Sequence, residues 1–453
     1  MLSRSRNLIK AALACVCMLA LGMSVSAQQE ASQPAPAAAA GPMNLDACIA
    51  VGMQRQPSLD AARASLSAAQ TGSQAINRMI IPRLFVPDLP VRRQQACLGV
   101  TIASASLTQA EWDTRYAITR NYFTVQYINM QRVVVDDTLR NLEASRKKAQ
   151  KIFDSGAAQV KITKIDLENL DTNFAIMKVK KAQIENGMLK AVAALREAMG
   201  IGCDDPFEIA ATGLPGDVYK VVHEKKDDKG IVLKDNKGKP LTYETFHRLY
   251  KLDKNELIAK GLANRGEMAR AATADEVVRL EVEAQRRIRG WKGGTFAQGA
   301  DLHVDPVPLM YANHDYKPGA TAPEMPNLIV GRKNDRLARA WDFAARSAAV
   351  VAKTSNLISL DVEVQFLNWQ EAAEDIEELS RIVDLASSLP KKVQDLDPID
   401  FTGSAVIQAN IQAITVRAQL NEAKHNHALA LAGLERATAG GFSIYPVPQP
   451  PTK

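Results

Sequence analysis

The fold depends above all on residues 108–199, which read TQAEWDTRYAITRNYFTVQYINMQRVVVDDTLRNLEASRKKAQKIFDSGAAQVKITKIDLENLDTNFAIMKVKKAQIENGMLKAVAALREAM. This stretch contains no proline and only two glycines, Gly156 and Gly187. Both residue types disfavour helix interiors, proline most strongly, so the stretch predicts two long helical arms joined near Gly156. At about 1.5 Å per residue, each arm is roughly 60–70 Å long. An antiparallel hairpin of this length is typical of coiled-coil proteins.

The second arm has apolar residues at heptad spacing, which predicts a coiled-coil seam. The seam consists of Leu167, Leu170, Phe174, Met177, Ile184, Met188, Ala191, Leu195 and Met199. A second stripe lies partly off this seam, at Ile162, Ile165, Ile176, Val179 and Val192. Two apolar flanks indicate neighbours on both sides of the helix, as in a sheet or closed ring of helices. A plain hairpin packed on a globular body is the alternative.

The N-terminus has the pattern of a secretory signal peptide. Three basic residues precede an uncharged apolar run at 11–21, and small residues at 25–27 form a cleavage site. We therefore expect export, with cleavage directly after this site. A lipoprotein acylated at Cys15 or Cys17 is the weaker alternative, because the apolar run before either cysteine is short. The segment 28–42 is rich in alanine, glutamine and proline and predicts a flexible leader.

Composition disfavours several classes of protein. The net charge is +6, and three of the positive charges lie in the signal peptide, so the rest of the chain has no electrostatic footprint for nucleic acid. The sequence contains no apolar stretch of about 18 residues, so no transmembrane helix is predicted. Three cysteines follow the predicted cleavage site, Cys48, Cys97 and Cys203, and their odd number and wide spacing fit neither a disulfide framework nor a metal site. Three buried thiols are expected, with one disulfide as the alternative.

The segment before the first long arm mixes helical and irregular patterns. Helices are predicted at 44–50 and, from an alanine-rich pattern, at 58–78. Three prolines make 81–107 irregular, with one short strand at 97–102.

The charged segment 215–253 is interpreted as an insertion. Its charge run at 223–229 predicts a solvated loop. Residues 230–233 and 241–244 then predict the two strands of a β-hairpin around a polar turn.

The chain then repeats itself after about 200 residues, which indicates an internal duplication. Ile49–Met53 is echoed by Ile258–Leu262, and Leu195–Ala198 by Leu434–Ala437. The predicted domains are a signal peptide (1–27), a leader (28–42), a first repeat (43–214), the insertion (215–253), a second repeat (254–440) and a flexible tail (441–453).

The second repeat predicts a second long hairpin. Residues 290–331 are irregular, with five prolines after 305, and 332–389 lack both glycine and proline. A turn is expected at 390–398, and a returning helix at 402–439.

The duplicated plan resembles the TolC family of outer-membrane efflux factors. The resemblance covers about 43–440 apart from the insertion, and its specificity comes from the order, duplication and placement of short motifs. These are Leu45-x-x-Cys48-Ile49-Ala50 and Pro57-Ser58-Leu59, their second copy in Leu257–Met268, and the tip motifs Lys151-Ile152-Phe153-x-x-Gly156 and Phe401-Thr402-Gly403.

The resemblance implies a mainly α fold of duplicated long antiparallel helical hairpins, the protomer of a coiled-coil α-barrel. It implies a homotrimer whose helices form a tunnel across the periplasm, continuing into a β-barrel in the outer membrane. The tips would dock onto a periplasmic adaptor linked to an inner-membrane pump. Such a protein is a conduit, so neither enzymatic activity nor a cofactor or metal is expected.

The resemblance also assigns roles to individual residues. Phe153, Gly156, Phe401 and Gly403 fall at the tip turns that meet the adaptor, with simple turn formation as the alternative. Asp166, ten residues past Gly156, is the candidate acid of the entrance, and the alternative is a solvated helix residue.

One departure from the family's pattern keeps a second function open. Neither 81–107 nor 290–331 shows two clean membrane strands of about 9–11 residues, so the β portion is expected to be small or reduced. The chain is therefore expected to be either a conduit of a tripartite efflux or type I secretion system, or a periplasmic coiled-coil scaffold that has lost the membrane barrel. Enzyme motifs were not found; His425 and His427 diverge on a helix at i, i+2 and cannot share a metal.

Overall fold

The computed structural model describes residues 41–80, 86–155, 163–202, 205, 207–225, 232, 240–288, 331–394 and 403–444. The predicted signal peptide and nearly all of the leader lie outside them. The chain divides into two compact units, 1–43 and 44–453, and every helix and strand below belongs to the second. That unit is mostly helical with one pair of strands among its described residues, which confirms the expected mainly α fold.

Two copies of one four-helix plan make up this unit. The first copy consists of α2 (Leu45–Arg55), α3 (Pro57–Arg78), α4 (Leu89–Ser155) and α5 (Lys164–Met199). The second consists of α6 (Lys254–Asn264), α7 (Gly266–Arg287), α8 (Lys333–Gln394) and α9 (Gly403–Ala437). Both copies open with helices of 11 and 22 residues. The internal duplication is therefore confirmed helix by helix.

Equivalent caps begin the two copies. The side chain of Asn44 accepts a hydrogen bond from the backbone of Ala47 at 2.9 Å, and Asp253 accepts two from the first turn of α6 at 2.7 and 3.1 Å. Such caps satisfy backbone N–H groups that have no partner within the helix. At the other end of the first copy, Gly200 adopts φ 65° and terminates α5. A glycine at this place in the sequence is typical of a helix end.

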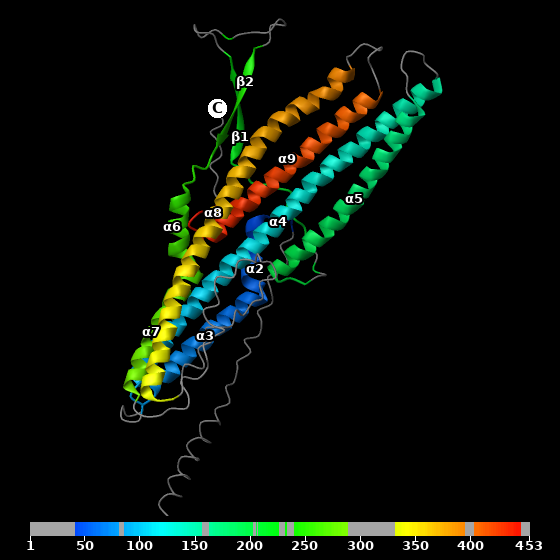
Figure 1. The fold of residues 1–453 in the computed structure, drawn as a ribbon. Coiled ribbons are helices and arrows are strands. Elements are labelled where there is room, and N and C mark those ends of the chain that lie inside the picture. Colours follow the sequence, from blue (N-terminus) through cyan, green and yellow to red (C-terminus); the bar gives the residue numbers. More distant parts are fainter. Residues whose placement is uncertain are drawn as a thin grey trace, which may run out of the picture. The chain divides into compact units, whose positions relative to one another are not determined.

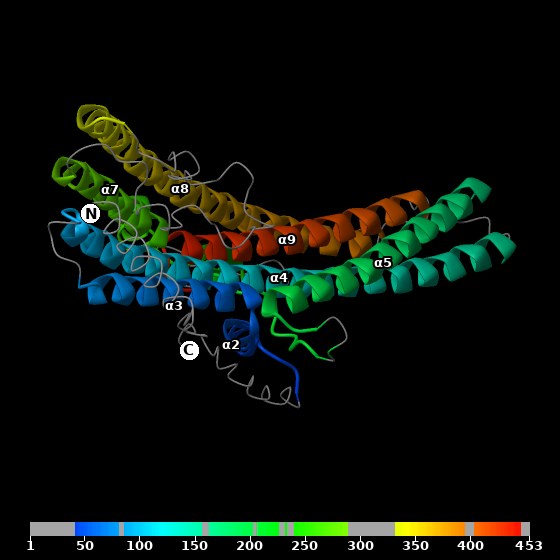
Figure 2. The same cartoon turned by 90° about the horizontal axis from the view of Figure 1, so that it is seen from below.

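The two longest helices, α4 and α8, organise the packing (Figures 1 and 2). We call the end where α4 stops and α5 starts the tip end, and the end where α3 stops and α4 starts the root end. Toward the tips, neighbouring helices pack in the order α5–α4–α9–α8. Toward the roots, the order is α3–α4–α7–α8 (Figure 2). The unit is thus a layer of long helices with α4 in its middle and α8 at one edge.

Apolar clusters lie between these helices. Leu142 and Ala149 of α4 enclose Leu170 of α5, and Leu167, Phe174 and Met177 pack against the same cluster. The predicted heptad seam of α5 is therefore its contact with α4. A second cluster joins α4 to α7 through Ile102, Ala274 and Val277, and a third joins α7 to α8.

The prediction for 81–107 is wrong over most of its length. Helix α4 begins at Leu89 rather than Thr108, and residues 97–102, predicted as a strand, are helical. Pro90 is the second residue of α4, where a missing N–H costs no intrahelical hydrogen bond. Residues 81–85 lie outside the described part of the chain.

The insertion contains an antiparallel hairpin, β1 (Val218–Glu224) paired with β2 (Thr242–Arg248). The predicted strand at 241–244 falls largely within β2. The predicted strand at 230–233 lies mostly outside the described residues, and 223–224, predicted as loop, end β1 instead.

Helix α8 also differs from expectation, since it continues through the predicted turn at Pro390 to Gln394. The predicted irregular segment 290–331 is outside the described residues except for Gly331. None of the described helices has an apolar stretch long enough to cross a membrane.

Candidate functional site

The predicted tip residues lie at or beside the helix ends, where they are described. Phe153 is in the last turn of α4 and is 44% exposed, and Gly403 is the first residue of α9. Gly156 and Phe401 lie outside the described residues. The tip position of Phe153 and Gly403 agrees with the sequence, and their contact with an adaptor stays a prediction.

Asp166 caps the first turn of α5. Its carboxylate accepts hydrogen bonds from the backbone N–H and the hydroxyl of Thr163 at 2.9 and 2.7 Å. The Thr163 hydroxyl in turn accepts from the backbone N–H of Asp166 at 3.2 Å. This reciprocal capping box, with an acid near the positive end of the helix dipole, stabilises the start of α5. The carboxylate therefore has a structural task that neither sequence interpretation included.

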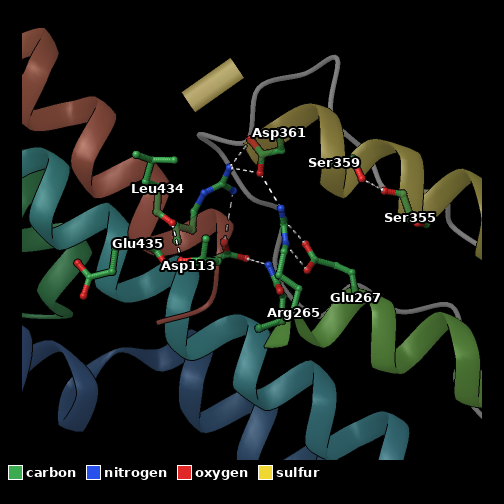
Figure 3. Close-up of polar contacts among 11 residues, drawn as sticks. Asp113, Arg265, Glu267, Ser355, Ser359, Asp361, Leu434 and Glu435 are labelled. Atoms are coloured by element: carbon green, nitrogen blue, oxygen red, sulfur yellow. Dashed lines mark hydrogen bonds and ion pairs between the residues drawn. The ribbon is translucent and has the colours of Figure 1, made fainter. Parts of the chain in front are cut away.

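A buried ion cluster lies at the junction between α6 and α7 (Figure 3). Arg265 has a side-chain exposure of 1%, donates to both carboxylate oxygens of Glu267 at 2.7 and 2.8 Å, and reaches Asp361 of α8 at 2.7 Å. Arg436 of α9 also donates to Asp361 at 3.0 Å and lies 3.7 Å from Asp113 of α4. These five residues, which we call the junction cluster, join α4 to the second repeat.

The junction cluster contains three carboxylates and two guanidinium groups. Burial raises the pKa of Asp113, and the nearby Arg436 opposes that shift. A second donor, the side chain of Gln109, reaches Asp113 at 2.9 Å. Removing one member of such a buried cluster leaves an uncompensated charge, which is strongly destabilising. The cluster therefore holds α4, α7, α8 and α9 in one fixed arrangement.

A second polar chain ties α4, α7 and α8 together at the root end. Arg92 of α4 donates to Asp88 at 3.0 Å and to both oxygens of Glu281 on α7. Gln285 donates to Glu281 at 2.6 Å and accepts from Arg336 of α8 at 2.9 Å.

One arginine contact at the root end occurs in both repeats. Arg93 donates to the carbonyl of Met79, the C-cap of α3, and Arg336 donates to the carbonyl of Ile288, the C-cap of α7. Met79 and Ile288 occupy equivalent places, so the repeats agree in individual contacts as well as in helix lengths.

Helix α8 exposes one continuous flank, which we call the α8 seam. Its residues succeed one another at steps of three or four, the spacing of a coiled-coil contact face. They are Leu360, Val364, Leu367, Glu371, Asp375, Glu378, Ile382 and Leu385, all exposed. Within the described chain, α4 packs extensively on helices of both repeats, whereas α8 packs extensively only on helices of the second. The α8 seam is thus an uncovered helix flank with apolar ends and an acidic centre.

Helix α5 exposes a matching flank at the opposite edge, which we call the α5 seam. It consists of Ile165, Thr172, Ile176, Val179 and Leu189. Its four large apolar side chains are 46–69% exposed. Three of them, Ile165, Ile176 and Val179, belong to the second apolar stripe of the sequence. The helix that should cover this stripe is not supplied by the described part of the chain.

Among the described residues, no group of three or more His, Cys, Asp or Glu side chains could hold a metal ion. His425 stacks on Tyr127 of α4 at 4.5 Å, and burial, with Arg120 nearby, lowers its pKa to about 4. His427 lies against Asp217 instead, so the two rings diverge as predicted. Both described cysteines are free, and Cys97 is exposed, which corrects the expectation of three buried thiols. Cys203 is outside the described residues.

No protein-family profile and no curated protein matches the sequence, but solved structures match its fold. The outer-membrane channel OprN matches with a TM-score of 0.62 and 12% identity over 87% of this chain and 90% of OprN. The outer membrane protein VceC of Vibrio cholerae matches with a TM-score of 0.60 and 14% identity over 88% and 97%. CusC, described as forming a transmembrane channel, matches with a TM-score of 0.62 and 12% identity over 87% and 91%.

The fold is that of the TolC-like outer-membrane channels. At 12–14% identity the likeness is one of fold, and it spans nearly the whole chain. Within this fold, the chain carries the junction cluster, the two seams and the inserted hairpin.

Proposed function

We propose that the chain is one subunit of a trimeric conduit in the outer membrane, with a periplasmic extension, that serves a tripartite efflux or type I secretion system. The observation that carries the proposal is the pair of uncovered seams on opposite edges of a duplicated layer of long helices. The fold shared with the channels OprN, VceC and CusC supports it.

The duplication suggests how the seams are covered. Helix α4 packs on α7 and α9, helices that belong to the other repeat. Helix α8 occupies the same place in the second repeat, but its corresponding neighbours would have to come from the next copy. Contacts of α8 with α3 and α5 of that copy would reproduce the packing of α4 and continue the layer. Head-to-tail contacts of this kind generate a ring when the rotation closes.

The two seams match in the distance of their residues from the tip end as well as in their chemical character. Ile176 lies as far from the start of α5, at Lys164, as Ile382 lies from the end of α8. Lys180, exposed beside the α5 seam, and Glu378 also lie equally far from these two helix ends. Antiparallel neighbours would therefore set apolar residues opposite apolar residues and a lysine opposite the acidic centre. Burying one large apolar side chain contributes about 1.5–3 kcal/mol, so several together favour assembly.

At the tips, we propose that Phe153, Gly156, Phe401 and Gly403 form the turns that meet a periplasmic adaptor bound to an inner-membrane pump. A role of Asp166 at the entrance would come in addition to its cap on α5. Export by the predicted signal peptide places the chain on the path to the outer membrane.

A charge exchange tests the assembly. The double variant Glu371→Lys/Glu378→Lys is expected to reduce the trimer fraction in detergent, measured by light scattering, because like charges then face each other across the seams. Adding Lys180→Glu and Lys190→Glu, which reverse the charge of two exposed lysines on α5, should restore it. A matched double change away from the seams, Glu143→Lys/Lys147→Glu, should leave the trimer fraction unchanged. A monomer in every condition, or a trimer indifferent to the charges, would contradict the seam contact.

The alternative, a periplasmic coiled-coil scaffold, is favoured by one observation. The connection between α3 and α4 spans 79–88, whereas the connection between α7 and α8 spans 288–332 and is several times longer. The short connection at 79–88 leaves no room for two membrane strands of about 9–11 residues each, as a scaffold without a membrane barrel would have it. Membrane fractionation separates the proposals, since a scaffold is extracted without detergent and a conduit produces steps of conductance in a planar bilayer.

A further inference from the structure

We infer that the inserted β1–β2 hairpin is a clasp that holds α5 of a neighbouring copy on the α8 seam. The inference rests on the proposed function, because it presupposes head-to-tail assembly through the two seams. It assigns a partner to an element that otherwise lies along the outside of one helix.

The base of the hairpin is fixed to α8 and α9. Asp217, directly before β1, has no exposed surface; it accepts a hydrogen bond from the indole N–H of Trp369 at 3.0 Å. His427 of α9 lies 2.5 Å from the same carboxylate. The backbone N–H of Leu249, directly after β2, donates to the Asp217 carbonyl at 2.9 Å and closes the base. Both strands therefore leave the helices from one anchored point.

One face of the hairpin then follows α8 toward the tip. Lys220 of β1 contacts Asp384 at 2.5 Å, and Arg248 of β2 contacts Glu377 at 3.2 Å. The guanidinium of Arg381 lies over the ring of Phe246 on β2, 5.2 Å from its centroid. Contacts of both strands with α8 keep the hairpin alongside this helix.

Strand β2 is the strand next to the α8 seam. Its side chains contact Glu374 and Arg381, which continue the line of Leu360 and Leu367 at intervals of seven residues. Residues at this interval lie on one face of a coiled-coil helix. Strand β1 contacts α8 at Asp384, through Lys220. Asp384 comes three residues after Arg381 and lies farther around the helix from the seam. A helix seated on the exposed part of the seam would therefore lie between α8 and the outer edge of β2.

The hairpin is stiffened on its opposite face. Tyr219 stacks on His247 at 5.6 Å and His223 stacks on Tyr243 at 5.1 Å, as cross-strand pairs. The hydroxyl of Thr245 lies between the two imidazoles, 2.8 Å from His223 and 3.1 Å from His247. Cross-strand aromatic pairs stabilise an isolated hairpin, which needs such support in water. The strands thus form a firm wall beside the seam.

The occupant is a second copy of this chain because the chain has the matching helix edge. On α5, Ile165, Thr172 and Val179 are exposed at intervals of seven, the same period as Leu360 and Leu367 on α8. Lys180 next to this line suits the acidic centre of the seam. Glu244, exposed on the α8-facing side of β2 and nearer the tip than Phe246, would come close to Thr172 of the neighbouring copy.

Disulfide trapping tests the clasp. The pair Glu244→Cys/Thr172→Cys, in full-length protein that also carries Cys97→Ser, is oxidised in detergent and run on a non-reducing gel. We expect covalent species at two and three times the chain mass. Either cysteine alone, or Glu244→Cys with Gln74→Cys on α3, should give none.

A second variant releases the hairpin without touching the seam. Lys220→Ala/Arg248→Ala removes three ion pairs of the hairpin with α8, to Asp384, Glu374 and Glu377, and should weaken the trimer by on the order of tenfold in dissociation constant, with unchanged helical circular dichroism. Arg279→Ala, which removes an exposed ion pair on α7, is the control and should have no effect. A trimer that forms normally without cross-links or sensitivity to hairpin release overturns the clasp and leaves the conduit standing. Failure of the unmodified chain to assemble overturns both, and trapping of a different protein by Glu244→Cys assigns the hairpin to that partner instead.

Discussion

The two repeats have nearly the same turn between their first two helices but opposite chemistry there. Gln56 joins α2 to α3 with φ −69° and ψ 117°, and its amide donates to the carbonyl of Glu197 at 3.3 Å. Arg265 joins α6 to α7 with φ −69° and ψ 133°, and its guanidinium is buried among carboxylates. Helix α4 packs on α2 and α3 as well, but only at the second turn does it contribute a carboxylate, that of Asp113, to a described ion cluster. Location in the layer, rather than backbone geometry, therefore decides whether the turn needs charged residues.

Replacing the polar side chain at each turn by methionine should give the largest difference in unfolding free energy between the repeats. Arg265→Met leaves Glu267 and Asp361 short of a buried partner, and we expect a loss of about 3–5 kcal/mol in the free energy of unfolding. Gln56→Met removes one neutral hydrogen bond and should cost about 1 kcal/mol. Urea denaturation followed by circular dichroism, at one protein concentration, measures both.

A compensating variant isolates the charge in this experiment. Arg265→Met/Glu267→Met removes one guanidinium and one carboxylate together, so it should recover part of the lost stability. Equal losses for Gln56→Met and Arg265→Met would show that the junction cluster is not the source of the difference.

The next residue sharpens the comparison through steric fit. A Cβ atom at Gly266 would lie 2.3 Å from the backbone carbonyl oxygen of Ala105 on α4. Its counterpart in the first repeat is Pro57, which already has a side chain. We expect Gly266→Ala to cost about 1–3 kcal/mol and Pro57→Ala less than about 1 kcal/mol, measured by the same denaturation. If alanine were tolerated at Gly266, the backbones of α4 and α7 would have to lie farther apart than the 2.3 Å distance implies.

The returning helices differ in the same way, since α9 lies within the layer and α5 at its edge. His425 of α9 has a pKa lowered from 6.5 to about 4, so the folded chain excludes a proton that the unfolded chain binds between these values. Stability should therefore fall as the pH drops from 7 to 5, by about 1–2 kcal/mol from this residue. His425→Phe keeps the stacking on Tyr127 and should remove that part of the pH dependence.

The measurement is the difference between wild type and His425→Phe at each pH. Asp113 and Glu435, whose pKa values are raised by burial, act in the opposite direction and cancel in this difference. A difference that does not change between pH 7 and 5 would rule out the assignment to His425.

The smallest effect is expected at the edge helix. Thr163→Ala removes the reciprocal cap of Asp166 and should cost about 1 kcal/mol, confined to the first turn of α5. Hydrogen exchange should show faster exchange near Asp166 and no change in α9. A global loss of protection would place the cap in the cooperative core instead of at a fraying end.

Much of the helical plan could be predicted from residues that interrupt helices. Pro57 begins α3 and Gly200 ends α5, as the sequence indicates. The interpretation of 81–107 failed because a proline marks the start of a helix as well as its interruption. Pro90 is the second residue of α4, and packing on α3 and α7, which no local pattern reveals, continues the helix through Gly99.

The site was less predictable because its partners are distant in sequence. The Thr163-x-x-Asp166 pattern is that of a helix cap. An interpretation of Asp166 based only on its distance from the tip misses this cap. The junction cluster offers no such pattern: Arg265 and Asp361 are 96 residues apart, and Asp361 and Arg436 are 75 apart. Only the fold brings these charges together.

The central position of α4 sets an order on folding. Two of its packing surfaces, those for α7 and α9, are supplied by residues that follow it by more than a hundred positions; Ile102, for example, is covered by Ala274 and Val277. An emerging chain thus carries a bare apolar flank along α4 until its last helix arrives. We expect half-length fragments to aggregate, and the full chain to need a holding chaperone during its passage.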